Sequence, residues 1–130
     1  MRILNESGYT ITDFASASDI INFGSASIVT DVGAATATHA SVSSAGIATF
    51  HISDSTLALR IVATESSIQS GAAAAGQAAL FQFGADAYLF ISDGTDGVTS
   101  ADVLIKLVGV DTTAAAFDTL TDGGTTFTIA

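Results

Sequence analysis

The sequence predicts an α+β fold: a β-rich single domain over residues 1–130, with short N-terminal strands and one amphipathic helix packed on a C-terminal antiparallel meander. Stretches in which apolar and polar residues alternate, as is typical of strands, lie on both sides of a central segment. In that segment apolar residues recur near the 3.6-residue period of a helix. A chain of this length has the size of one domain with its own core. The pattern changes between a β-rich part, residues 1–52, and a helix with a meander, residues 53–130.

The N-terminal part consists of short alternating segments separated by small residues. We expect strands in "GYTITDF", "DIINFG" and "SIVTDV", because each contains β-branched residues and is followed or preceded by a small-residue turn. The run from Gly33 to Ala45 is small and polar without a period, which predicts a loop or an irregular edge. The segment "IATFHIS" alternates again and predicts a further strand.

The helix is predicted over residues 55–70, within "SDSTLALRIVATESSIQSGAAAAG". Leu57, Ile61 and Ile68 fall near one helical stripe. Polar residues at 53–55 (Ser53, Asp54 or Ser55) can cap its start, and Gly76 can end it.

The C-terminal part predicts three strands, near residues 79–83, 87–91 and 103–108. Gly84 supports a tight turn between the first two, which therefore form a hairpin. A last strand, residues 126–130, follows a turn at "DGG". We expect the large side chains of the meander to pack against Leu57, Ile61 and Ile68; these side chains are Phe81, Phe83, Tyr88, Phe90, Ile105 and Leu107.

The charge of the chain restricts its partners. Thirteen acidic residues against three basic ones give a net charge of −10, which repels nucleic acids and anionic lipid surfaces. No apolar stretch reaches the roughly 18 residues of a membrane span, so we expect no membrane insertion, and the start "MRILNESGYT" lacks the pattern of a signal peptide. The same charge attracts cations, and calcium is the favoured metal because it prefers carboxylate and carbonyl oxygens.

The sequence contains no recognisable catalytic motif, and we predict that the domain is not an enzyme. Metalloprotease, nucleophile-elbow and phosphate-binding patterns are all missing. His39 lies in the small-residue loop and His51 in a predicted strand, where a surface or strand-filling role is the simpler interpretation.

Two groups of aspartates are candidate calcium ligands. Asp13 and Asp19 lie six residues apart across a predicted turn, so both can face one cation if the chain folds back. Asp93, Asp96 and Asp102 share a glycine-containing loop, but acids at loop positions 1, 4 and 10 do not match an EF-hand. Aspartate also begins turns by bonding to its own backbone. This simpler interpretation applies to both groups. We rank the first pair above the second group because calcium takes six to eight oxygens, and three carboxylates spread over ten residues supply them only if backbone carbonyls and waters also turn inward. We interpret the second group as a solvated turn.

Two segments resemble known secreted proteins. "YTITDFASASDIINF" resembles the Y-x-I-x-D-F…D-x-I-x-F segment that follows the glycine-rich repeats of RTX-type calcium-binding proteins, which bacterial type I secretion exports. "ALFQFGADAYLFISDGTDGVTSADVLIKLVGV" is similar to the C-terminal tails of large secreted surface and S-layer-like proteins. The calcium-binding nonapeptide repeat is missing, so the resemblance extends only to the non-repeat region.

This resemblance implies a non-enzymatic C-terminal domain that serves export and cell-surface assembly or anchoring. Its partners would be the type I export machinery, further copies of itself and other surface-layer proteins, and its location would be extracellular. Asp13 and Asp19 match the family's Asp of D-F and Asp of D-x-I, which can complete a calcium site at the end of a repeat array.

Two alternatives remain open at this point. A self-associating adhesin or filament subunit is suggested by proline-free strands with few charged residues to protect their edges. A glycan-active enzyme domain would use an aspartate pair as acid and base.

Overall fold

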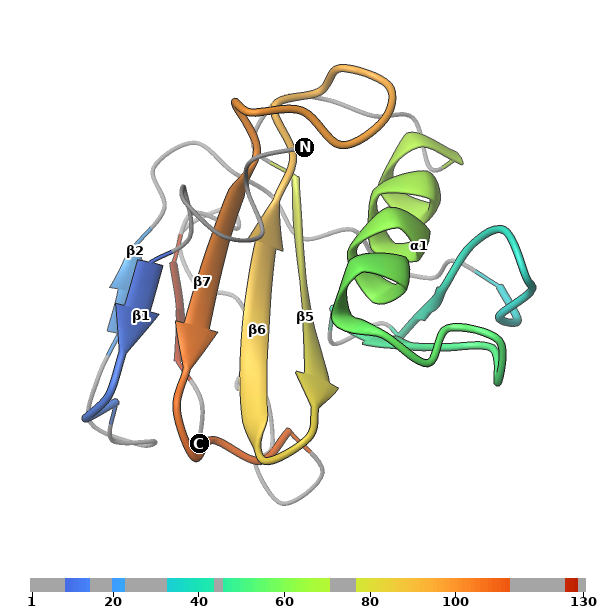
Figure 1. The fold of residues 1–130 in the computed structure, drawn as a ribbon. Helices are drawn as coiled ribbons and strands as arrows, with labels where there is room; N and C mark the ends of the chain where they lie inside the picture. The colour runs from blue at the N-terminus through green and yellow to red at the C-terminus, as the bar shows by residue number, and fades with distance from the viewer. Residues whose placement is uncertain are drawn as a thin grey trace.

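The structure, a computed structural model, describes residues 9–14, 20–22, 33–43, 46–70, 77–112 and 126–128. These ranges contain one helix and eight strands, and they confirm a β-rich single domain of the α+β class (Figure 1). The elements are β1 (Tyr9–Ile11), β2 (Ile20–Asn22), β3 (Ser41–Val42), β4 (Ile47–Thr49), α1 (Leu57–Ser70), β5 (Ala78–Phe83), β6 (Asp86–Ile91), β7 (Val103–Leu107) and β8 (Thr126–Thr128). The strand expected in "SIVTDV" and the helix stop expected at Gly76 lie outside the described residues.

Six strands form one mixed sheet in the order β1-β7-β6-β5-β4-β3. Its centre is the predicted antiparallel meander, in which β5 pairs with β6 and β6 with β7. β1 and β4 join the meander in parallel, β1 beside β7 and β4 beside β5. β2 and β8 pair antiparallel as a separate ribbon. The meander is therefore flanked by N-terminal strands on both sides.

The β5–β6 turn has the predicted form. Phe83 pairs with Asp86, which leaves a two-residue loop. Gly84 there has a φ of +64°, in the left-handed region that favours glycine. The glycine thus fixes the register of the hairpin.

Both faces of the meander are buried, because its strands are almost continuously apolar. On one face, Ile61 and Ile68 of α1 pack with side chains of the meander: Ala79, Phe81, Tyr88, Phe90 and Leu104. Figure 1 shows α1 beside β5 on this side. On the other face, Leu80, Leu89 and Leu107 form a second cluster with Val110, and Ile11 and Phe14 pack against it.

The expected core is correct for the hairpin and wrong for β7. Phe81, Tyr88 and Phe90 do pack on the helix side, with Phe83 and Leu57 partly buried there. Ile105 and Leu107 belong to the opposite cluster instead. Alternation along β7 puts these two residues on one face and Leu104 on the other, and register with β6 (Phe90↔Leu104) turns Leu104 toward the helix.

The helix begins at Leu57, and its N-cap lies one residue after the last of the candidate caps. The Thr56 hydroxyl oxygen accepts the N–H of Leu59 at 3.2 Å, so Thr56 is the N-cap in place of Ser53, Asp54 or Ser55. His51 lies in a turn rather than a strand, because β4 ends at Thr49.

The helix is also fastened to the segment before β3. The N–H of Ala40 donates to the carbonyl of Ala63 at 3.1 Å, and the hydroxyl of Ser67 donates to the carbonyl of Ala40 at 2.6 Å. The region expected to be a loop or irregular edge therefore ends in a short edge strand, β3, held against α1.

Phe90 is 0% exposed, and we expect Phe90→Ala to lower the free energy of unfolding by about 3 kcal/mol or more, since it empties the space between helix and sheet. Urea unfolding measures this. Ile52→Ala, at a side chain that is 92% exposed, is the control and should change stability by less than about 0.5 kcal/mol. A loss below about 1 kcal/mol for Phe90→Ala would contradict the packing of α1 on the hairpin.

Candidate functional site

The acidic loop between β6 and β7 is held together by its own carboxylates. Asp102 accepts the backbone N–H groups of Asp93 at 2.8 Å and Thr99 at 2.6 Å. Asp93 accepts the N–H of Thr95 at 2.8 Å and the hydroxyl of Thr99 at 2.9 Å. Each of the four carboxylate oxygens thus accepts a hydrogen bond from within the loop.

The three aspartates of this loop differ in exposure. Asp96 is exposed and Asp93 half-buried, whereas Asp102 is only 2% exposed. Gly94 and Gly97 have φ angles of +85° and +82°, which allows the chain to curl around Asp102. The expectation of a solvated turn is therefore correct for Asp96 and wrong for Asp102, which is an internal brace.

A buried glutamate of α1 takes part in the hydrogen bonds that connect the helix to the same loop. Glu65 is 1% exposed, and its Oε1 accepts hydrogen bonds from Gln69 at 2.5 Å and Ser92 at 3.1 Å. Gln69 also donates to the carbonyl of Thr95 at 3.0 Å, and the Ser92 oxygen accepts the N–H of Gly94 at 3.0 Å. The helix and the acidic loop are thus joined by the hydrogen bond from Ser92 to Glu65 and by the hydrogen bond from Gln69 to Thr95.

Sequence reasoning did not single out Glu65. The available signal is its position on the buried stripe, four residues after Ile61 and three before Ile68. An acidic residue at this position is either buried together with the isoleucines or prevents this side of the helix from packing on the sheet.

Burial and hydrogen bonding shift the pKa values of Glu65, Asp102 and Asp93 in different directions. Burial raises the pKa of Glu65, and the nearby charges of Asp102 and Asp93 raise it further, against the hydrogen bonds from Gln69 and Ser92. Burial also raises the pKa of Asp102. The backbone N–H of Thr95 lowers the pKa of Asp93. The negative charge of the network is therefore held best at Asp93, at its outer end.

The higher-ranked pair, Asp13 and Asp19, is only partly described. Asp13 is exposed and lies two residues beyond β1, whereas Asp19 lies outside the described residues. β1 runs parallel to β7, with Ile11 opposite Leu107, so Asp13 is at the end where β7 finishes. The acidic loop lies at the end where β7 begins (Figure 1). Asp13 and the acidic loop therefore lie at opposite ends of the sheet.

Among the described residues, no cluster of three or more histidine, aspartate or glutamate side chains is arranged to hold a metal ion. The two histidines make local contacts. Nδ1 of His39 lies 3.1 Å from the carbonyl oxygen of Ala40, and Nδ1 of His51 lies 2.9 Å from the hydroxyl of Ser53.

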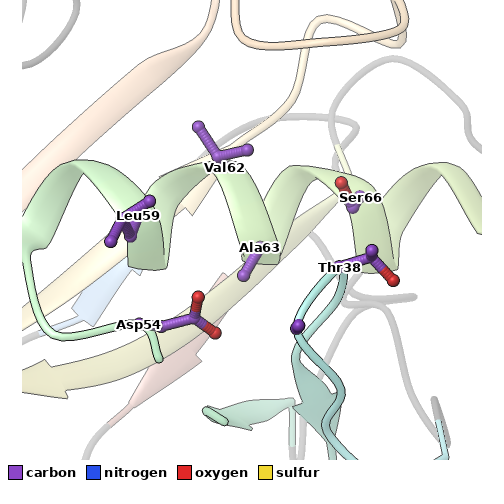
Figure 2. Close-up of a pocket in the computed structure, with 7 residues that line it drawn as sticks. Thr38, Asp54, Leu59, Val62, Ala63 and Ser66 are labelled. Carbon is purple, nitrogen blue, oxygen red and sulfur yellow. The ribbon is translucent and has the colours of Figure 1, made fainter. Parts of the chain in front are cut away.

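A cavity of about 340 Å³ lies beside the start of α1. Figure 2 shows the carboxylate of Asp54 turned into the space between the helix and the segment that contains Thr38. Asp54 is 5% exposed, and its Oδ2 is buried without a hydrogen-bond partner in the described part of the chain. Sequence reasoning considered Asp54 only as a helix cap, a role that Thr56 fills.

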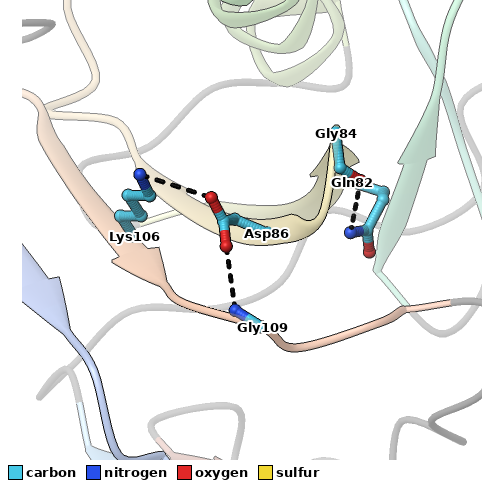
Figure 3. A network of polar contacts seen from close by, with 5 residues as sticks. All are labelled: Gln82, Gly84, Asp86, Lys106 and Gly109. Atoms are coloured by element: carbon cyan, nitrogen blue, oxygen red, sulfur yellow. Dashed lines mark hydrogen bonds and ion pairs between the residues drawn. The ribbon is translucent and has the colours of Figure 1, made fainter.

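The two basic residues that the structure describes are both engaged within the fold. Lys106 lies 3.3 Å from one carboxylate oxygen of Asp86, and the other carboxylate oxygen accepts the N–H of Gly109 at 2.8 Å (Figure 3). The Gly109 bond and then Lys106 lower the pKa of Asp86. Arg60 stacks on two phenylalanine rings, each 5.1 Å from its guanidinium carbon, and donates to two backbone carbonyls.

No protein-family model and no curated protein matches the chain. In the part of the chain that the structure describes, no helix has the length and apolar character needed to cross a membrane.

The raised pKa of Glu65 leads to a test by pH. A raised pKa means that the fold favours the protonated form, so the contribution of this group is fully present below its ordinary value of 4.5 and is lost as pH rises through the folded-state pKa. Glu65→Gln stays uncharged at every pH and keeps a carbonyl oxygen as acceptor. We expect the variant to gain stability relative to the parent between about pH 4 and about pH 8.

Urea unfolding of parent and variant at the two pH values measures this difference in stability. The contributions of the other titrating groups are common to both proteins and cancel when the two are compared. Asp96→Asn removes a charge at an exposed position and should show no such gain. A stability difference between parent and Glu65→Gln that is the same at both pH values would contradict the raised pKa.

Proposed function

We propose that the chain is a non-enzymatic C-terminal domain of a bacterial surface or calcium-binding protein exported by type I secretion, with a role in export and in cell-surface assembly or anchoring. The observation that carries the proposal is the parallel pairing of β1 with β7, Tyr9 opposite Ile105 and Ile11 opposite Leu107. These strands come from the two separate segments that resemble secreted proteins. The two motifs therefore contribute to one sheet, as expected if they belong to one kind of module.

The pairing of β8 with β2 adds support from the other end of the chain. Residue 20 pairs with residue 128 and residue 22 with residue 126, so the last described strand returns to the N-terminal motif. A ribbon of two three-residue strands is marginal by itself. Such a ribbon can open at little cost, which suits a C-terminal segment that an exporter has to engage as an extended chain.

Self-association remains a second candidate function because the sheet ends in short strands. In the described part of the chain, β1 forms one edge of the six-stranded sheet, and Tyr9 on β1 is 63% exposed. An edge strand offers unpaired backbone groups to another copy. A glycan-active role has less support, because the carboxylates of Asp93 and Asp102 are committed to holding their own loop.

The export role predicts the effect of a truncation. In the full-length protein, produced in cells with a type I exporter, deletion of residues 125–130 should leave the protein inside the cell. Immunoblots of medium and cells measure the distribution. Thr128→Pro is a matched variant, since it removes a backbone N–H from β8 without shortening the chain. Normal export of the truncated protein would overturn the export role.

The calcium role predicts a change in thermal stability. We propose Asp13 and Asp19 as ligands of a weak extracellular site, supported by the exposure of Asp13 and by the net charge of −10. Calcium at a hundredfold excess over its dissociation constant should stabilise the fold by about 2.7 kcal/mol. Melting curves with calcium and with chelator measure the shift.

The ranking of the aspartates is tested by matched variants. Asp13→Asn should abolish the calcium-dependent shift, whereas Asp96→Asn, at an exposed position of the other acidic group, should retain it. An unchanged melting temperature of the parent up to about 10 mM calcium, beyond the range of weak extracellular sites, would refute both groups as binders.

A further inference from the structure

The cavity beside α1 combines a buried carboxylate with an accessible apolar wall. Its lining contains three oxygen-bearing side chains, Thr38, Asp54 and Ser66, and four apolar ones, Ala37, Leu59, Val62 and Ala63. Leu59 and Val62 are 44% and 45% exposed, so the cavity can be reached from solvent along the helix. The cavity therefore has both polar and apolar lining groups, which suits a ligand that has a polar and an apolar part.

The carboxylate of Asp54 lacks the partner that its burial calls for. Its Oδ2 is buried and accepts no hydrogen bond in the described part of the chain. Arg60, the nearest described cation in sequence, donates to the backbone carbonyl of Asp54 at 3.0 Å and to the carbonyl of Gln82 at 2.7 Å. A buried acceptor without a donor is costly unless something else supplies the hydrogen bond.

We propose that this cavity binds a primary alkylammonium group, whose nitrogen donates to the carboxylate of Asp54 and whose methylene chain lies along Leu59 and Val62. The ammonium group supplies both the positive charge and the N–H donors that the carboxylate of Asp54 lacks. Figure 2 shows Leu59 and Val62 on the helix and Asp54 on the segment before it. The methylene chain replaces water at the apolar wall.

A bare metal ion fits this lining less well. Calcium takes six to eight oxygen ligands, and the lining offers one carboxylate and two hydroxyl groups against four apolar side chains. The chemistry of an alkylammonium group occurs both in free amines and in lysine side chains. The net charge of −10 favours either source.

Titration of the ¹⁵N-labelled chain with n-butylammonium chloride, against potassium chloride at equal ionic strength, tests the proposal by NMR. We expect saturable shifts of the amides of Thr38, Asp54 and Ser66, with a dissociation constant on the order of millimolar for so small a ligand. Asp54→Asn, which keeps the shape and removes the charge, should weaken binding about tenfold or more. Asp96→Asn removes one charge at an exposed site and should leave binding unchanged within about twofold.

A second variant keeps the test decisive if Asp54→Asn fails to fold. Ser66→Phe fills the cavity from the helix while the carboxylate stays in place, and it should also abolish the saturable shifts. Unsaturable shifts in the parent, or equal affinity in the parent and Asp54→Asn, would overturn the proposal. Tetramethylammonium carries the charge without N–H donors, so binding as tight as that of n-butylammonium would also overturn it.

The two sources of the ligand are separated by a capped lysine. Binding of Nα-acetyl-lysine N-methylamide with an affinity comparable to that of n-butylammonium supports a lysine side chain of a polypeptide as the occupant. Binding of n-butylammonium alone supports a small free amine. Either result agrees with an alkylammonium site, and failure of both probes refutes it without bearing on the export role.

Discussion

Burial of both faces of the β5–β6–β7 meander is the constraint on which the rest of the structure depends. The two longest strands are apolar almost throughout, so neither face can remain in water. Phe81 and Phe90 require a cover on one side, and Leu80 and Leu89 require one on the other. α1 covers the first side, whereas Ile11, Phe14 and Val110 cover part of the second. Segments that precede the meander in the sequence, residues 11–14 and α1, therefore have to meet at this sheet.

The same constraint brings polar groups into the interior. A helix that covers a sheet buries a full stripe, and in α1 that stripe includes Thr64, Glu65 and Ser67 besides the isoleucines. The hydroxyls donate to backbone carbonyls, Thr64 to that of Arg60 at 2.7 Å and Ser67 to that of Ala40 at 2.6 Å. Glu65 instead accepts a hydrogen bond from Gln69, one turn further along α1, and another from Ser92 at the edge of the acidic loop. Polar burial thus connects the helix to the segments around it.

Local patterns in the sequence were sufficient for most elements and for the antiparallel meander, but not for the pairing of strands that lie far apart in the sequence. The helix, the hairpin at Gly84 and the strand of β7 follow from spacing and turn chemistry, which depend on near neighbours only. The parallel pairing of β1 with β7 joins residues 9 and 105, and no local period encodes contact over such a separation. Alternation likewise groups Ile105 with Leu107 but does not say which face receives the helix. An acidic loop that contains glycines predicts an exposed Asp102. In the structure Asp102 is buried instead, because its carboxylate accepts hydrogen bonds from backbone N–H groups of the loop.

Among the described residues, Asp54 and Glu65 each have a buried carboxyl oxygen without a hydrogen-bond partner, and they differ in what the fold gains from them. An unsatisfied buried acceptor costs about 1–3 kcal/mol, a considerable share of a total stability of about 5–15 kcal/mol. For Glu65 this cost is offset by the hydrogen bond from Ser92, which joins helix and loop, and by the hydrogen bond from Gln69 within α1. Burial also raises the pKa of Glu65 and so favours its neutral form. The side chain of Asp54 instead lines a cavity, its Oδ2 has no partner in the described part of the chain, and Thr56 already caps the helix. Hydrogen bonds within the fold therefore explain why Glu65 can be buried. The burial of Asp54 is best explained by the binding of an alkylammonium group in the cavity.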